Sequence, residues 1–132
     1  MLAILAPGQG AQVPGFLTPW LEVPGVADVV AWWSAVLDLD SERAAAVAVP
    51  LGGRGFHDMA AFLEAVDVVT VASPATLHAE HALAALSAGK PVYVEKPIAI
   101  TLADAERVRA AAAATGLVVA CGHQERVIFQ AM

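Results

Sequence analysis

The sequence predicts an α/β fold in which helices cover both faces of a doubly wound parallel sheet. Apolar runs and helix-like segments alternate along the 132 residues, and no internal repeat is present. The clearest strand, Asp67–Ala72, is apolar without alternation, as expected for a parallel strand that is covered on both faces. Alternating strands and helices favour right-handed crossovers into one sheet. We expect five or six short strands in a single domain spanning residues 1–132.

The other expected strands are short apolar runs between turn residues. They are Leu2–Ala6, Val36–Asp38, Arg54–Phe56, Pro91–Glu95 and Leu117–Cys121. Four helices are expected where apolar residues recur at helical spacing: Val26–Ala35 with the adjacent Trp32 and Trp33, Ser41–Val49, His57–Val66, and a segment from Ser73 to about Ala88. A fifth helix follows Thr101 and ends near Gly116.

Cap residues define the ends of these helices. Ser41, Ser73 and Thr101 are the expected N-caps, and Pro74 suits the first helical position after Ser73. Asp104 lies three residues after Thr101, in a variant of the capping box. Gly89 is a suitable residue to end the helix that begins at Ser73.

Composition excludes several classes of protein. Hydrophobic residues make up 58% of the chain and charged residues 15%, which argues against disorder. The net charge of -6 argues against nucleic-acid binding. Apolar runs are too short to span a membrane, and residues 1–6 lack the basic start of a signal peptide. The single cysteine, Cys121, fits a cytoplasmic protein and is more typical of a small core residue than of a nucleophile.

Ionisable residues follow several of the expected strands, where open α/β sheets bind ligands. Glu95-Lys96-Pro97 follows one strand and Ser73-Pro74 another. Asp38 ends the second strand, where its carboxylate either accepts hydrogen bonds from ribose hydroxyls or is a solvated loop acid. Gly8 and Gly10 follow the first strand, where they either bind phosphates or form a structural tight turn. A lone G-x-G is weak evidence for phosphate binding, and Pro14 and Gly15 delay the helix that would face the phosphates.

Two histidines, His78 and His81, lie three residues apart on one expected helix. This spacing would suit a metal pair, but no third ligand is placed to complete a site. We therefore expect no metal, and we expect His78 to be a packed, hydrogen-bonded helix residue.

Residues 36–132 resemble the nucleotide-binding domain of the Gfo/Idh/MocA oxidoreductases. Four motifs carry the resemblance in the family's order: Asp38-Leu39-Asp40-Ser41-Glu42-Arg43-Ala44, Ser73-Pro74-Ala75-Thr76-Leu77-His78, Glu95-Lys96-Pro97 and Gly122-His123-Gln124-Glu125-Arg126. The resemblance implies a Rossmann-like fold that binds NAD or NADP, with NAD favoured by Asp38.

The resemblance also implies roles for individual residues. Lys96 would contact the nicotinamide ribose and the substrate hydroxyl and would assist its deprotonation. Glu95 would orient the motif, and the bond before Pro97 is a candidate cis peptide. Ser73, Pro74 and His78 would border the nicotinamide. His123 and Arg126 would lie near the substrate or in a polar loop.

Residues 1–35 resemble a different family, the malonyl-CoA:acyl carrier protein transacylases. Pro7-Gly8-Gln9-Gly10-Ala11-Gln12 is similar to the amino terminus of these enzymes, and Gln12 matches a glutamine that assists their oxyanion hole. Their G-H-S-x-G motif is absent, so acyl transfer is disfavoured. We expect a chimera joined near residues 35–38.

The family's substrate-binding domain is missing from these 132 residues, so we expect a truncated dinucleotide-binding domain with little turnover alone. The alternative is a folded chimera without specific activity. The apolar surface that meets the second domain in the family predicts self-association, and a homo-oligomer is the expected assembly.

Overall fold

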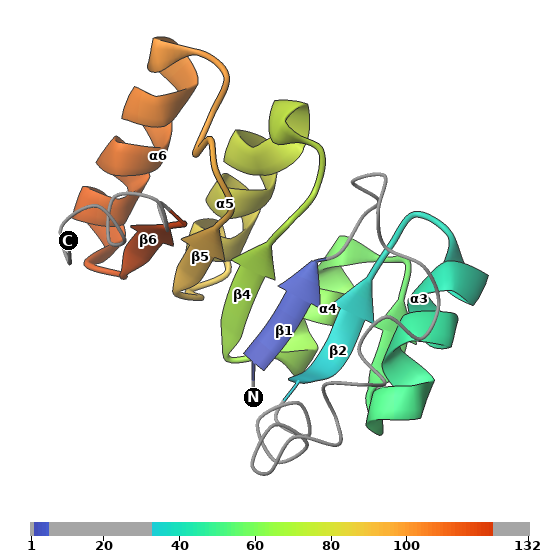
Figure 1. The fold of residues 1–132 in the computed structure, drawn as a ribbon. Helices are drawn as coiled ribbons and strands as arrows, with labels where there is room; N and C mark the ends of the chain where they lie inside the picture. Colours follow the sequence, from blue (N-terminus) through green and yellow to red (C-terminus); the bar gives the residue numbers. More distant parts are fainter. Residues whose placement is uncertain (1, 6–32, 123–132) are drawn as a thin grey trace, which may run out of the picture.

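Six parallel strands form one sheet in this computed structural model, which describes residues 2–5 and 33–122 (Figure 1). The strands are β1 (Leu2–Leu5), β2 (Trp33–Leu37), β3 (Arg54–Phe56), β4 (Val68–Val71), β5 (Val92–Val94) and β6 (Val119–Cys121). Their order in the sheet is β3-β2-β1-β4-β5-β6, and every neighbouring pair is parallel. The Rossmann-like fold expected from the sequence is confirmed.

The first strand lies at the centre of the sheet. Leu2 pairs with Val68 and Leu5 with Val71, so the amino-terminal run takes the place of the first strand of this fold. From β1 the chain builds outward to β2 and β3, and then returns to β4 on the other side. The direction of building therefore reverses between β1 and β4. Open α/β sheets bind ligands at such a reversal.

The helices within residues 33–122 are α3 (Ser41–Ala48), α4 (Met59–Ala65), α5 (His78–Ser87) and α6 (Leu102–Thr115), with short 3-10 turns at Val49–Leu51 and Ala75–Leu77. Right-handed crossovers place α3 on one face of the sheet and the other three helices on the opposite face. Figure 1 shows α4 and α5 behind the strands.

The core lies between the sheet and the helices behind it. Phe62 of α4 and Leu86 of α5 are almost completely buried, as are Val69, Val71 and Val94 from the central strands. Phe56 and Phe62 pack edge to face with ring centroids 5.9 Å apart. Valine suits these strands because its branched side chain fits a pleated surface covered on both sides.

Four helix ends follow from local chemistry. The Thr101 hydroxyl accepts a hydrogen bond from the Asp104 N–H and donates one to the Asp104 carboxylate, so the expected cap is confirmed. Gly89 and Gly116 have φ values of 75° and 68° after α5 and α6, a conformation that favours glycine. Asp58 caps α4, so this helix begins at Met59 and not at His57 as expected.

The helix expected over Val26–Ala35 is wrong at its carboxyl end. Residues 33–35 belong to β2, which begins at Trp33 and contains part of the short strand expected at Val36–Asp38. Pairing with both β1 and β3 outweighs the helical spacing of this apolar run. Trp32 and the remainder of that segment lie outside the described residues.

Two expected caps are also wrong. Asp40, and not Ser41, caps α3: its carboxylate accepts hydrogen bonds from the N–H groups of Glu42 and Arg43. Ser73 does not cap the next helix, because Pro74 has a non-helical ψ of 138° and a 3-10 turn precedes α5. The polar groups of Ser73 contact histidine side chains instead.

Gly55 allows α3 to lie directly on β3. A Cβ atom at this position would lie 2.6 Å from the backbone nitrogen of Ala45. Only glycine permits this approach, so the position of α3 over the sheet depends on Gly55. In the part of the chain that the structure describes, no helix is long and apolar enough to span a membrane.

Candidate functional site

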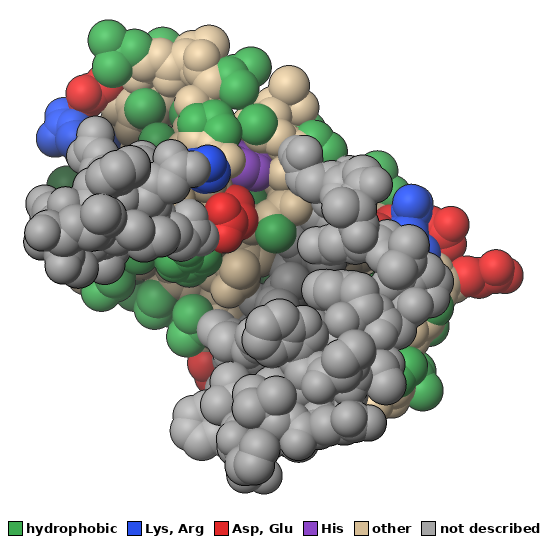
Figure 2. Space-filling model, in the orientation of Figure 1, with side chains coloured by type: hydrophobic (Ala, Val, Ile, Leu, Met, Phe, Trp, Pro, Cys, Tyr) green, Lys and Arg blue, Asp and Glu red, His purple; other side chains and the backbone are tan. Residues whose placement is uncertain are grey.

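The candidate site lies along the edge of the sheet where β2, β4 and β5 end. Asp38 follows β2, Ser73 follows β4 by two residues, and Glu95 and Lys96 follow β5. Parallel pairing brings these strand ends to one edge, on both sides of the reversal between β1 and β4. Figure 2 shows an acidic, a basic and a histidine side chain gathered above the ends of β4 and β5.

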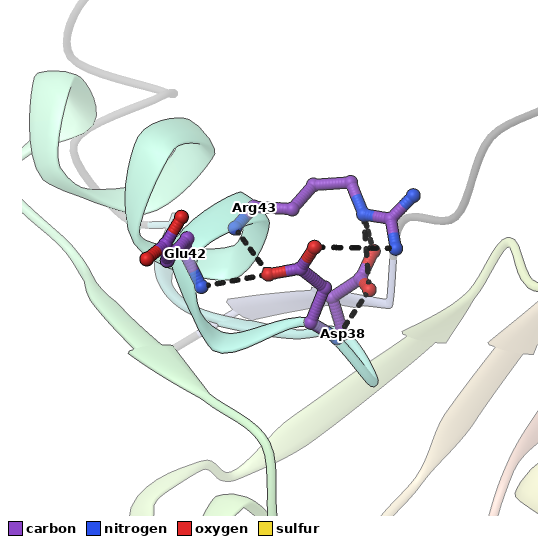
Figure 3. Close-up of polar contacts among 4 residues, drawn as sticks. Asp38, Glu42 and Arg43 are labelled. Atoms are coloured by element: carbon purple, nitrogen blue, oxygen red, sulfur yellow. Dashed lines mark hydrogen bonds and ion pairs between the residues drawn. The ribbon is translucent and has the colours of Figure 1, made fainter.

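Asp38 is a buried carboxylate, 8% exposed, which is held by its own segment (Figure 3). Its Oδ1 accepts hydrogen bonds from the Asp40 N–H at 2.9 Å and from Arg43 Nε at 3.2 Å. Oδ2 lies 3.1 Å from the same Arg43 nitrogen. The Asp38 N–H bonds the Phe56 carbonyl and so ties this residue to β3. The carboxylate is therefore fixed at the end of β2.

Ser73 and two histidines connect the end of β4 with α5. Nε2 of His78 lies 2.6 Å from the Ser73 carbonyl oxygen, and Nδ1 of His81 lies 2.8 Å from the Ser73 hydroxyl. Ser73 and His78 are both buried, and His81 is half-buried. The expectation that His78 is a packed, hydrogen-bonded helix residue is confirmed.

The Glu95-Lys96-Pro97 loop leaves the sheet beside this turn. The Glu95 N–H donates to the Val71 carbonyl at 2.9 Å, and the Lys96 N–H donates to Glu95 Oε2 at 3.3 Å. The Lys96-Pro97 peptide is cis, as expected. The Lys96 side chain is exposed. The lysine thus lies at the rim of this edge and faces solvent on at least one side.

Burial and neighbouring charges shift the pKa values of three titratable groups near the site. Burial lowers the pKa of His81, the Glu80 carboxylate opposes this shift, and His78 adds to it. Burial raises the pKa of Cys121, and the negative charge of Glu95 raises it further. The pKa of Tyr93 is raised by the same two causes. Cys121 is half-buried, so it is less completely buried than expected, but its thiol is not activated.

Several expected site residues fall outside the described residues. They are Gly8, Gly10, Gln12, His123 and Arg126. Residues 2–5 and 33–122 contain no group of three or more histidine, cysteine, aspartate or glutamate side chains that could hold a metal ion. The site described here is therefore built from Asp38, the Ser73 turn and the Lys96 loop.

The sequence reasoning missed three partners of these residues. Arg43 holds Asp38, Asp40 caps α3, and His81 bonds the Ser73 hydroxyl. The sequence contained a signal for the Asp40 cap, because an aspartate just before a helical run is a strong N-cap candidate. The His81 contact had no such signal, since it depends on how α5 turns over Ser73.

The residues present fit a dinucleotide. A carboxylate offers about four acceptor positions, and the contacts described for Asp38 leave room for a ribose hydroxyl. The Ser73 turn and Lys96 lie across the reversal, where the other half of an extended ligand would bind. This chemistry, an acid at one side and a lysine at the other, matches a ribose and a second charged or hydroxylated group.

Comparisons with known proteins point the same way. The model of an oxidoreductase family with an NAD-binding Rossmann fold, Gfo/Idh/MocA, matches residues 8–123. Inositol 2-dehydrogenase 3 of Saccharopolyspora erythraea is 44% identical over 84 residues, which are 62% of this chain and 25% of that protein. UDP-N-acetylglucosamine 3-dehydrogenase of Acidithiobacillus ferrooxidans is 36% identical over 94 residues, or 71% of this chain and 30% of that protein.

A relative named malonyl CoA-acyl carrier protein transacylase, from Mycobacterium bovis, is 39% identical over 94 residues, 71% of this chain and 29% of that protein. This match is much longer than the segment 1–35 that suggested a transacylase. The family model also begins at residue 8, inside that segment. A junction near residue 35 is therefore not confirmed.

Solved structures share the fold. UDP-N-acetylglucosamine 3-dehydrogenase of Acidithiobacillus ferrooxidans superimposes with a TM-score of 0.76 at 29% identity, over 96% of this chain and 39% of that one. GenD2, solved with NAD, gives a TM-score of 0.70 at 27% identity, over 92% of this chain and 33% of that one. The strand order, the placement of Asp38 and Lys96 and the match over residues 8–123 agree: this chain belongs to the Gfo/Idh/MocA oxidoreductase family with an NAD-binding Rossmann fold.

Proposed function

We propose that this chain binds NAD(H) across the ends of β2, β4 and β5 and serves as the cofactor-binding part of a dehydrogenase. The observation that carries the proposal is the placement of Asp38 and Lys96 on opposite sides of the reversal between β1 and β4. A dinucleotide is long enough to use both.

The adenosine ribose would bind at Asp38, whose carboxylate accepts hydrogen bonds from its hydroxyls. Arg43 orients the carboxylate through contacts at 3.1 and 3.2 Å. The 2′-phosphate of NADP would meet this negative charge, so NAD is the favoured cofactor. Arg43 reduces the discrimination because its guanidinium would attract that phosphate. The solved structure of KijD10 from Actinomadura kijaniata, which shares 26% identity, contains NADP.

The reaction would be oxidation of a secondary alcohol. The carbon that bears the hydroxyl loses a hydride and the hydroxyl loses a proton, so the product is a ketone. The nicotinamide, when bound, accepts the hydride. Lys96 Nζ would contact the hydroxyl and assist its deprotonation. Glu95 contacts the Lys96 N–H and so helps to fix the loop, while Ser73, Pro74 and His78 form the wall beside it.

Turnover needs a substrate site as well as a cofactor site. The chain spans 25–30% of the length of the curated relatives described above. Hydride transfer requires both reactants to be held within reaction distance. We therefore propose that residues 1–132 by themselves bind cofactor and show little turnover.

The experiment is a titration of this chain with NADH, followed by the fluorescence of the nicotinamide. We expect saturable binding that weakens at least about threefold in Lys96→Ala, as for loss of one modest contact. Lys90→Ala is the matched control: this lysine lies at the opposite end of β5, and its removal should leave the affinity unchanged. Absence of binding at millimolar NADH would contradict the proposal.

A further inference from the structure

His78 contacts two separate loops at the site through one imidazole ring. Its Nε2 lies 2.6 Å from the carbonyl oxygen of Ser73, and its Nδ1 lies 2.6 Å from the carbonyl oxygen of Pro97. The side chain is 2% exposed, although it is the first residue of α5. One side chain therefore joins the turn after β4 to the loop after β5.

Both partners of the ring are acceptors. A carbonyl oxygen carries no hydrogen, so each contact requires an N–H on the imidazole. A ring with one N–H satisfies one carbonyl and turns a lone pair toward the other at 2.6 Å, which is repulsive. A ring with two N–H groups donates to both. The positions of the two oxygens therefore favour the doubly protonated form, which carries a positive charge.

Some nearby groups favour a positive charge on His78 and others oppose it. The amino-terminal end of α5 and the neighbouring His81 oppose it, and Glu80 in the first turn of the helix favours it. Glu95 and Lys96 belong to the loop that packs against the ring, and their charges have opposite signs. The two carbonyl dipoles lie closest, at hydrogen-bond distance, and they favour the cation.

The contact with Pro97 fixes the loop that carries Lys96. Before the lysine, the Glu95 N–H is bonded to Val71 of β4. After it, the Pro97 carbonyl is bonded to His78. Lys96 thus lies between two residues whose backbones are both tied to other elements.

We propose that His78 is a positioning residue that donates from both ring nitrogens and thereby sets the position of Lys96 relative to the Ser73 turn. The proposal rests on the proposed function, because the effect of His78 is exerted through a lysine that contacts the cofactor. It assigns His78 no contact with the reacting atoms. Besides forming part of the wall beside the cofactor, His78 would link the Ser73 turn to the Lys96 loop.

The first test reads the ring directly. A long-range proton–nitrogen correlation spectrum of the wild-type chain at pH 7 should show two protonated ring nitrogens for His78. The exposed His57 serves as the reference histidine. A His78 ring with one protonated and one unprotonated nitrogen would overturn the proposal. This measurement needs no cofactor, so its outcome is distinct from a failure to bind NADH.

The second test asks whether His78 acts through Lys96. His78→Gln keeps a donor at one end only, and we expect it to weaken NADH binding about threefold, no more than Lys96→Ala does, because its effect is exerted through that lysine. In a Lys96→Ala background the same change should weaken binding by less than about twofold. His57→Gln, the control, should have no effect in either background. Equal losses in both backgrounds would overturn the positioning role. If His78→Gln does not fold, the nitrogen spectrum of the wild type decides the proposal.

Discussion

Arg43 Nε lies 3.1 Å from the Asp38 carboxylate, so the acid that ends β2 is held in place by the first turn of the helix that follows it. The arginine is largely exposed and the aspartate is buried. An exposed arginine contributes little to stability in such a pair, because water screens its charge. The main effect of the Arg43–Asp38 pair is to orient the buried carboxylate at the end of the sheet.

Asp38→Asn tests the ribose role of this carboxylate. The amide oxygen can still accept the hydrogen bond from the Asp40 N–H, so the fold should persist. We expect NADH affinity to fall about tenfold, through loss of charged hydrogen bonds, and NADPH affinity to change less. Fluorescence titration with both cofactors measures the ratio. Glu42→Gln changes an exposed side chain of α3 and should leave both affinities unchanged. An unaltered ratio of NADH to NADPH affinity in Asp38→Asn would contradict the ribose role of Asp38.

Gly55→Ala tests the close approach of α3 to β3. The added methyl group would lie 2.6 Å from the Ala45 nitrogen, so the helix must shift. We expect the free energy of unfolding to fall by about 1–3 kcal/mol, in the range for overpacked sites. Urea denaturation measures it. Ala46→Leu adds bulk on the exposed side of the same helix and should change stability by less than about 0.5 kcal/mol.

A pair of alanine substitutions distinguishes the cap seen in the structure from the cap expected from the sequence. Asp40→Ala removes the acceptor for the N–H groups of Glu42 and Arg43, at a cost of about 1 kcal/mol. Ser41→Ala removes an exposed hydroxyl at the first position of α3 and should cost much less. Thermal or urea unfolding of the two variants gives the comparison. A larger loss for Ser41→Ala would mean that the cap is misassigned.

His81 should titrate below about 6.5, the ordinary value for histidine, because burial lowers its pKa. Its neutral form is favoured in the folded chain. Its contribution therefore makes the folded state less stable as the pH falls through 6.5, where the unfolded chain gains the proton first. The carbon or nitrogen shifts of His81 followed by NMR from pH 8 to 5 give its midpoint. A midpoint above 6.5 would contradict the assigned burial.

Self-association remains a prediction. Ile100, Leu102 and Val118 are exposed apolar side chains near α6 and β6, and they provide surface for it. Light scattering of the wild-type chain should show a mass above that of a monomer, and a Leu102→Ser variant should shift the mass toward the monomer. A monomer at high concentration would contradict this prediction.

The sequence predicted the elements of the central and carboxyl-terminal parts of the sheet, because their signals are local. The run Val68–Ala72 is apolar except for Thr70, and Thr101 and Gly116 bound a helix by their own chemistry. It failed at Trp33, where spacing suggested a helix and pairing with two strands made β2. Tertiary pairing of this kind has no signal within a short window of sequence.

The site was predicted as a set of residues and not as a set of contacts. Asp38, Ser73 and Lys96 follow strands, so their shared edge could be inferred from the order of elements. The link from His78 to Pro97 joins residues 19 apart, on a helix and a loop that meet only after folding. No periodicity or spacing in the sequence indicates it.

The most direct test of the central claim is to map NADH binding on this chain residue by residue with backbone NMR shifts. We expect saturable changes at Asp38, Ser73 and Lys96, on both sides of the reversal in the sheet, and none at the exposed Ala114 at the far end of α6. Saturation without changes at Asp38 and Lys96, or no binding at millimolar NADH, would contradict it.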